Sequence, residues 1–197
     1  MEKELIEKNK ENFIGIAKEN ISRDGIDQLL SYLESTDFFY APASSKFHLA
    51  AEGGLCAHSL NVYHRLEKLM QIEYGEDEYN RESVAICALF HDICKACYYK
   101  IDYRNVKENG VWVQKPYYTV DDILPYGHGE KSVYIINGFM RLSREEAIAI
   151  NWHMGGFDKR VQGGDPAYQA AYSKYPFAVL LHMADLSASY LDEIQGD

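Results

Sequence analysis

One short segment limits what this chain can fold into. Residues 84–90 read Val-Ala-Ile-Cys-Ala-Leu-Phe and are apolar at every position. A helix that is apolar all round lies at the centre of a fold rather than on its surface. His91 and Asp92 follow directly, and a charged carboxylate at the end of a buried helix is costly without a partner. The segment therefore predicts a central helix that ends in either a tightly hydrogen-bonded His–Asp pair or a set of metal ligands.

Helical periodicity dominates the rest of the chain. The predicted helices cover residues 5–20, a segment after an N-cap at Asp24, a long segment from Gly54 through Leu69, residues 84–95 after an N-cap at Ser83, residues 130–140, a segment from the Ser143–Glu146 capping box to His153, and residues 176–194. Glycine, proline and serine interrupt residues 37–49 and 154–166, which we expect to be loops.

Residues 98–119 are the exception to the helical pattern. They are rich in Tyr and Val, and Asn109-Gly110 lies in their middle. Asn-Gly between two such runs is a strong signal for a β-hairpin. We therefore predict an all-α domain with a small inserted hairpin near residues 98–119. The aromatic rings of this segment either simply favour strands or flank a site and stack on a base, and the residues alone leave both interpretations open.

Composition limits the partners. The chain has 197 residues, of which 47% are hydrophobic and 25% charged, and this suits one globular domain. A formal net charge of −10 disfavours a long nucleic acid but not a small anionic substrate. No apolar run has the length of a signal peptide or a membrane span, so we expect a cytosolic protein with no membrane partner. Its four cysteines are then expected to be reduced thiols.

Further histidines and aspartates fall on inward faces or at helix ends. His58 lies on the apolar stripe of its helix, and Asp185 lies among apolar residues of the last helix. His128 begins a predicted helix and His153 ends one. Imidazole and carboxylate groups together suit Mn, Fe, Co, Ni or Zn better than Mg or Ca. Burial of so many polar groups becomes favourable if they share metal ions.

The order of these residues resembles that in the HD-domain metal-dependent phosphohydrolases. The resemblance covers about residues 47–192, and it is closest over residues 48–60 (HLAAEGGLCAHSL) and 88–95 (ALFHDICK), which are similar to the HD domains of bacterial 3′–5′ exoribonucleases. It implies an HD-domain helical bundle. Residues 1–197 would form a single domain, with N-terminal helices in residues 1–46 and the metal-binding core in residues 47–192.

The resemblance also implies a binuclear metal site. Two divalent ions, Mn, Fe, Zn, Ni or Co, would be bound, with Asp92 bridging them. The implied ligands are His58, His91, Asp92 and Asp185 for the first ion, and His128 and His153 together with Asp92 for the second. Cys94 stands where many members have glycine, which places a larger side chain beside the site.

The implied activity is hydrolysis of a phosphomonoester or phosphodiester in a nucleotide or short oligonucleotide, through a metal-bound hydroxide. Asp92 and Lys95 are the predicted catalytic residues, and Lys95, His48 and Tyr98 are the predicted substrate contacts. A solvated lysine, a surface histidine and a strand tyrosine are the plain alternatives for these three. Two other functions stay open: a di-iron oxygenase built from the same ligand types, and a non-catalytic nucleotide-binding module. The oligomeric state is not indicated.

Overall fold

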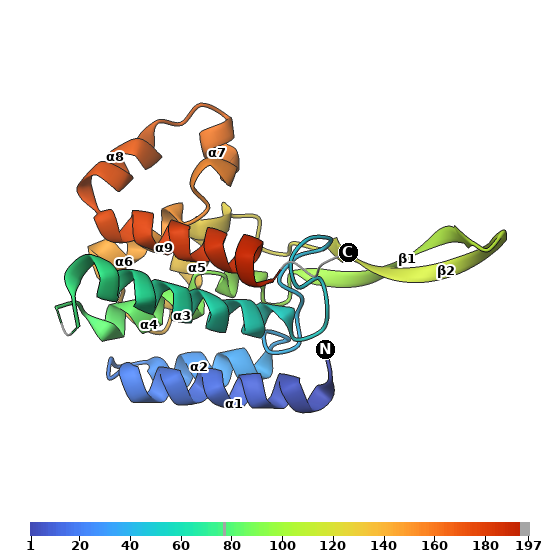
Figure 1. Ribbon diagram of the computed structural model, residues 1–197, viewed down its shortest axis with the longest axis horizontal. Coiled ribbons are helices and arrows are strands. Elements are labelled where there is room, and N and C mark those ends of the chain that lie inside the picture. Colours follow the sequence, from blue (N-terminus) through green and yellow to red (C-terminus); the bar gives the residue numbers. More distant parts are fainter. Residues whose placement is uncertain (77, 194–197) are drawn as a thin grey trace.

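The computed structural model describes residues 1–76 and 78–193, and these form a mainly helical body with one small β-hairpin (Figure 1). The helices are α1 (Lys3–Asn20), α2 (Ile26–Ser35), α3 (Gly54–Tyr74), α4 (Arg81–Phe90), α5 (His128–Asn137), α6 (Arg144–Trp152), α7 (Lys159–Gln162), α8 (Ala167–Lys174) and α9 (Pro176–Ser187). Short 3₁₀ turns, η1 (Ile93–Lys95) and η2 (Gly155–Phe157), and a π-helical turn, η3 (Ala188–Asp192), accompany them. The strands are β1 (Tyr99–Glu108) and β2 (Val111–Val120). This confirms the predicted helical fold with a hairpin.

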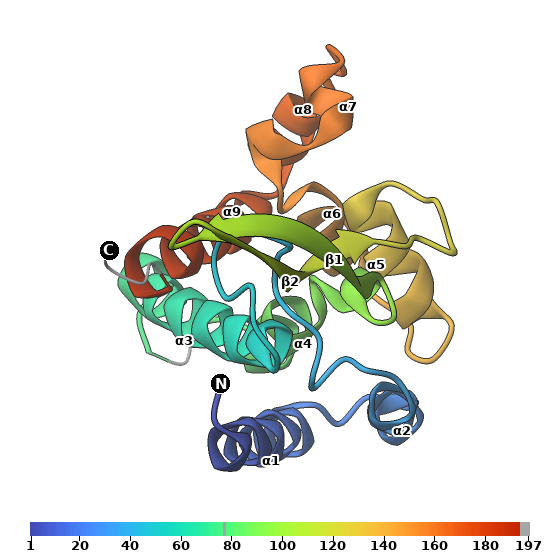
Figure 2. The same cartoon turned by 90° about the vertical axis from the view of Figure 1, so that its right-hand side faces the viewer.

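Helix α4 lies at the centre of the helical body, as its sequence predicts. Every side chain from Val84 to Phe90 is at most 2% exposed. Helices α1, α3 and α6 all contact α4, and α9 packs on α3 and α6. Helices α1 and α2 lie on one side of the body, while α7 and α8 stand beyond α9 on the other side (Figures 1 and 2). The elements that surround α4 are therefore the ones that can place side chains around its C-terminal end.

Two helix starts differ from the prediction. Asn80, not Ser83, caps α4, because the Asn80 side chain accepts a hydrogen bond from the Ser83 backbone N–H over 3.1 Å. Helix α2 begins after Gly25 with no side-chain cap, so the cap predicted at Asp24 is wrong. Gly25 has φ +97°, and a Cβ there would collide with the carbonyl oxygen of Phe139. The close approach of Gly25 to Phe139, rather than a side-chain cap, therefore determines where α2 begins.

Two helix ends and one predicted loop also differ. Helix α4 stops at Phe90, and residues 93–95 form the separate turn η1 instead of extending the helix to Lys95. At Asp92 the backbone has φ −104° and ψ 16°, outside helical geometry, in a region where many active-site residues lie. Helix α9 stops at Ser187 before η3, and the predicted end at Ile194 lies outside the described residues. The loop predicted over residues 154–166 contains η2 and α7.

Two local predictions are confirmed. The Ser143 hydroxyl accepts from the Glu146 backbone N–H over 3.2 Å, and the Glu146 carboxylate accepts from the Ser143 N–H over 2.7 Å. This is the predicted capping box at the start of α6. In the hairpin, β1 and β2 pair antiparallel, and both turn residues, Asn109 and Gly110, have positive φ angles of 49° and 88°. Two positive φ angles in a two-residue loop define the type I′ turn that Asn-Gly favours.

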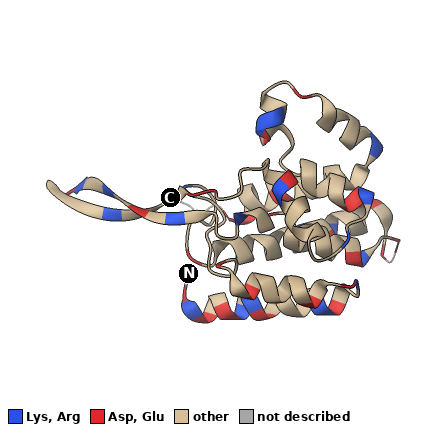
Figure 3. Cartoon of the chain, turned by 180° about the vertical axis from the view of Figure 1, so that it is seen from behind, with Lys and Arg blue, Asp and Glu red and all other residues tan. Residues whose placement is uncertain are grey.

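The hairpin forms an arm, residues 99–120, that projects from one end of the helical body (Figure 1). Its base closes where the Asp121 N–H donates to the Tyr98 carbonyl over 2.9 Å. Lys and Arg outnumber Asp and Glu on the arm by four to two, whereas the whole chain is acidic (Figure 3). Among the described residues, no helix has the length and apolar character needed to cross a membrane.

Candidate metal centre

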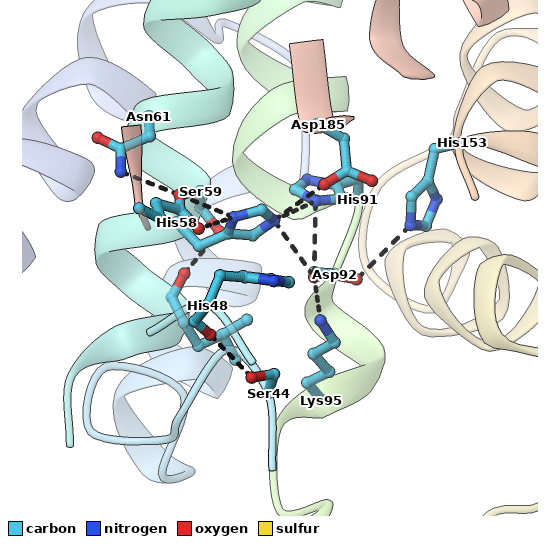
Figure 4. Close-up of polar contacts among 12 residues, drawn as sticks. Ser44, His48, His58, Ser59, Asn61, His91, Asp92, Lys95, His153 and Asp185 are labelled. Atoms are coloured by element: carbon cyan, nitrogen blue, oxygen red, sulfur yellow. Dashed lines mark hydrogen bonds and ion pairs between the residues drawn. The ribbon is translucent and has the colours of Figure 1, made fainter. Parts of the chain in front are cut away.

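The polar residues that the sequence singles out meet at the end of α4, around Asp92. Figure 4 shows five of the six, all except His128. They come from five helices or from their immediate ends, and therefore from segments far apart in the sequence. The six are His58 on α3, His91 at the C-cap of α4, Asp92 just after it, His128 at the start of α5, His153 at the C-cap of α6, and Asp185 on α9. The structure thus brings together all six predicted ligands.

The two carboxylate oxygens of Asp92 face two different pairs of histidines. Oδ1 lies 2.7 Å from His128 Nε2 and 3.6 Å from His153 Nε2. Oδ2 lies 3.7 Å from His58 Nε2 and 3.6 Å from His91 Nε2. The Asp92 side chain is only 3% exposed, so no bulk water replaces these partners. A carboxylate placed in this way can bridge two cations.

Asp185 completes the group on the Oδ2 side. Its Oδ1 lies 3.2 Å from His58 Nε2, and His58 Nε2 lies 3.3 Å from His91 Nε2. The three side chains offer ligand atoms that all lie within 4.8 Å of one another, and so do His91, Asp92 and His153. Nitrogen and oxygen donors in such groups match the chemistry of Mn, Fe, Co, Ni and Zn. Each of these groups could therefore hold a divalent ion.

Backbone carbonyls fix the orientation of two of the histidines. His91 Nδ1 donates to the Ala88 carbonyl over 2.8 Å, and His153 Nδ1 donates to the Ile150 carbonyl over 2.6 Å. Because a carbonyl only accepts, each Nδ1 carries a proton, and each ring directs its Nε2 toward Asp92. His153 Nε2 is buried and makes no hydrogen bond within the described residues. A metal-binding histidine has this arrangement: one ring nitrogen donates a hydrogen bond, and the other faces the ion.

Glu193 orients the third histidine, and the sequence analysis missed it. Its two carboxylate oxygens lie 3.0 and 3.1 Å from His58 Nδ1, and the Asn61 side chain donates to Oε1 over 3.0 Å. Glu193 is 5% exposed. A carboxylate behind a ligand histidine holds the ring and raises its basicity. No local pattern signals this role, because Glu193 lies 135 residues from His58.

The charges of the cluster are strongly coupled. Burial lowers the pKa of His91 to about 3, so its ring is neutral at pH 7. Burial alone would also lower the pKa of His58, but hydrogen bonds to Asp185 and Glu193 raise it to about 10. The pKa of Asp92 lies well below its usual value, because Lys95 and the neighbouring histidines outweigh the effect of burial. The protonation of the cluster is therefore set by its buried hydrogen bonds as much as by burial itself.

Lys95 and His48 lie at the same site, whereas Tyr98 does not. Lys95 Nζ donates to Asp92 Oδ2 over 2.6 Å, and the side chain is 13% exposed, so Lys95 is not a solvated surface lysine. The His48 ring lies 5.0 Å from the His58 ring, and its Nε2 is buried without a hydrogen-bond partner in the described part of the chain. The Tyr98 ring instead lies under Lys131 Nζ, 5.0 Å away, and does not line the cavity described below.

Cys94 contacts a candidate ligand directly. Its Sγ lies 3.3 Å from His128 Nδ1, and it forms one further group of close donor atoms with Asp92 and His128. The sequence places Cys94 beside the site. The structure adds that its thiol contacts Nδ1 of His128, the ring nitrogen that points away from Asp92. Cys94 therefore orients the ring of His128, as backbone carbonyls orient the rings of His91 and His153.

A cavity of about 740 Å³ opens onto the cluster. Asp92, Lys95 and Asp185 line the cavity where it meets the cluster, and His48 lies in the same lining. The remaining lining residues are Lys46, Phe47, Leu49, Ala50, Ala51, Met154, Phe157, His182, Leu186, Ser189, Tyr190 and Glu193. The size lies within the range of roughly 300–1,000 Å³ that is usual for small-molecule sites.

Comparison of the chain with models of protein families, with curated proteins and with solved structures found no match.

Proposed function

We propose that this protein is a metal-dependent phosphohydrolase of the HD-domain type, which cleaves a phosphomonoester or phosphodiester of a nucleotide or short oligonucleotide. The observation that carries the proposal is the position of Asp92. Each of its oxygens faces a separate pair of histidines in a buried site. A buried hydrogen-bonded His–Asp pair needs one such partner and not four.

The donor set indicates which residues would hold the ions. His58, His91 and Asp185 would bind one, His128 and His153 the other, and Asp92 both. Two bound divalent ions would lower the pKa of a water molecule and neutralise the charge of a phosphate group. The orphaned Nε2 of His153 supports this assignment, because a buried acceptor without a partner is costly unless something binds it.

Lys95 is suited to bind the phosphate group. Its Nζ lies at the wall of the cavity and uses one hydrogen bond to Asp92 Oδ2. An ammonium group offers three donors, so two stay available for phosphate oxygens. Lys95 stays protonated: burial lowers the pKa of Lys95, but the neighbouring Asp92 carboxylate raises it by more. Lys95 therefore positions the ester and offsets negative charge as it develops on the phosphate.

His48 is suited to bind the other side of the ester. His48 belongs to the cavity lining next to His58, and its Nε2 is buried without a hydrogen-bond partner among the described residues. Burial is the main cause of the lowered pKa of His48, so the ring is neutral at pH 7. A neutral ring either donates or accepts at Nε2, according to its tautomer. It can therefore pair with a hydroxyl group or an ester oxygen of the substrate.

The test is a screen of esters against metals. The purified chain is loaded separately with Mn, Fe, Co, Ni and Zn and is offered p-nitrophenyl phosphate, bis-p-nitrophenyl phosphate, a nucleoside monophosphate and a short oligonucleotide. We expect hydrolysis of at least one ester. We also expect kcat/KM to fall by about 10²-fold in Lys95→Gln, with unchanged metal content, because a charged contact to the phosphate is lost. The matched control is Lys18→Gln, which removes a lysine from the exposed face of α1.

The opposite outcome is equally specific. If no ester is cleaved with any metal, while the iron-loaded protein consumes oxygen, the proposal is wrong and a di-iron oxygenase replaces it. If the chain binds nucleotides but turns over neither ester nor oxygen, it is a binding module.

A further inference from the structure

The cavity next to the metal centre is charged in one part and apolar in the other. Asp92, Lys95 and Asp185 gather where the cavity meets the cluster. Most of the other lining side chains are apolar, and they come from three separate segments: the loop before α3, the turn η2, and the region from α9 to η3. A phosphate group accounts for the charged part alone.

Four large apolar side chains of this lining are exposed. Phe47 is 81%, Phe157 53%, Leu186 37% and Tyr190 56% exposed. Single exposed apolar residues are ordinary, but several that line one cavity indicate a binding site for an apolar group. Three of the four, Phe47, Phe157 and Tyr190, carry aromatic rings, and a flat apolar body that stacks on such a ring gains contact area.

Three polar residues of the lining are occupied or lie at the cluster. His182 Nδ1 donates to the His153 carbonyl over 2.6 Å and is therefore occupied. The Glu193 carboxylate is occupied by His58 and Asn61. His48 lies beside His58, at the charged part of the cavity. Lys46, Ser189 and the Tyr190 hydroxyl are the other polar groups of the lining, and apolar side chains outnumber them.

We infer that the preferred substrate is a phosphate ester whose organic half is an apolar ring system or chain, bound among Phe47, Phe157, Leu186 and Tyr190 while Lys95 binds the phosphate. The inference rests on the proposed function for the phosphate half. The cavity of about 740 Å³ accommodates a body of one or two fused rings. Nucleotides enter this class through the flat faces of their bases, so nucleotides with different bases bind alike.

The experiment compares two phosphonates, whose carbon–phosphorus bond is not hydrolysed. Binding of 1-naphthylmethylphosphonate and of methylphosphonate to the Mn-loaded protein is measured by titration calorimetry. We expect the naphthyl compound to bind at least about tenfold more tightly, since it buries a ring that the methyl compound lacks. In Leu186→Ala and in Phe157→Ala, the naphthyl compound should bind about three- to tenfold more weakly, and methylphosphonate should bind as in the wild type.

Met183→Ala is the matched control. Met183 lies on the same helix as Leu186 and is 43% exposed, but it does not line the cavity. We expect it to leave both affinities unchanged. Equal binding of the two phosphonates by the wild type overturns the inference, and so does a naphthyl preference that survives both cavity substitutions.

The ester screen separates this inference from the proposed function. Ester hydrolysis without a naphthyl preference overturns the inference alone. A naphthyl preference that is lost in Leu186→Ala, in a protein that hydrolyses no ester, supports the apolar binding site and contradicts the phosphohydrolase.

Discussion

The end of α4 and the arm that follows it are opposites, although few residues separate them. Phe90 and His91 are 0% exposed, whereas Ile101 is 58% and Tyr103 is 62% exposed. The first region buries charged groups, and the second exposes apolar ones. Buried charges are unstable without partners, so the first region is held by many distant segments at once. The arm is held by its own cross-strand pairs, and its exposed rings need no partner for folding.

The candidate site belongs to the helical body, and the arm lies outside it. The site depends on contacts between α3, α4, α5, α6 and α9, so its geometry is a property of the whole helical body. An isolated two-stranded hairpin is marginally stable in water. We therefore expect the arm to unfold independently of the body. Substitutions in the body should lower its free energy of unfolding more than changes in the arm do.

The largest effect is expected from a cavity in the core next to the site. Phe90 is fully buried and packs edge-on against Phe13, with the ring centroids 5.7 Å apart. Phe90→Ala should lower the free energy of unfolding by about 3–5 kcal/mol. On the arm, Trp112 is 68% exposed, and Trp112→Ala should change it by less than about 0.5 kcal/mol. Urea unfolding measures both, and similar losses in the two variants would refute the contrast.

A smaller effect is expected from the ion pair that ties α6 to the N-terminal helices. Arg23 Nη1 lies 2.7 Å from Glu146 Oε2, and the Glu146 side chain is 1% exposed. Glu146→Gln should cost about 2–3 kcal/mol, because it leaves Arg23 with one carboxylate partner fewer. The matched control is Glu145→Gln on the exposed side of α6, for which we expect no change.

The same pair gives a pH dependence. Burial alone would raise the pKa of Glu146, but hydrogen bonds from Arg23 and Ser83 lower it below 4.5. A carboxyl whose pKa is lower in the folded than in the unfolded state adds stability at high pH, and this stability is lost as pH falls through the folded pKa. The difference between wild type and Glu146→Gln should therefore shrink as the pH falls from about 5 through the lowered pKa of Glu146. A difference that stays constant over this range would show that the charge of Glu146 is not responsible.

Removal of the whole arm should affect the helical body even less. The two ends of the arm meet at the hydrogen bond between Asp121 and Tyr98, so a short Gly-Ser linker can replace residues 99–120. We expect the free energy of unfolding of the body to change by less than about 1 kcal/mol. Circular dichroism and urea unfolding of the shortened chain measure this change. A shortened chain that does not fold would show that the arm is part of the core.

The smallest effect on the body is expected from the turn of the arm. Gly110 has φ 88°, and Gly110→Ala places a side chain in a conformation that costs about 1 kcal/mol. Amide hydrogen exchange should become faster along β1 and β2 and stay unchanged in α4. Equal acceleration in α4 would contradict the independence of the two regions.

Local signals in the sequence predict local structure well. The capping box of α6 depends on two residues three positions apart, and the hairpin turn depends on Asn109-Gly110, so nothing distant decides either of them. Leu5 and Ile6 are adjacent apolar residues of the first helix, yet Leu5 is 46% exposed. The neighbouring Ile6 is 3% exposed and is the residue that faces the core. Periodicity therefore finds a helix but does not always find which residue of an adjacent apolar pair is buried.

The site was predictable in part. The six polar residues stand out because each interrupts an apolar pattern or marks a helix end, and the structure brings them together. Glu193 and Cys94 act on ring nitrogens of His58 and His128, which only the folded arrangement places beside them. The early end of α4 is similar, because the non-helical backbone at Asp92 is what turns the chain away from the helix there. Contacts of this kind depend on tertiary packing and leave no local pattern.

The central claim is that Asp92 is shared by two metal ions, and metal content tests it most directly. Elemental analysis is carried out on the wild type, Asp92→Ala, His128→Ala and His64→Ala, after equal exposure to each metal. His64→Ala is the control, because His64 lies on the same helix as His58 but is exposed. We predict two ions per chain in the wild type and in the control, one in His128→Ala, and none in Asp92→Ala. A full metal load in Asp92→Ala would contradict the account.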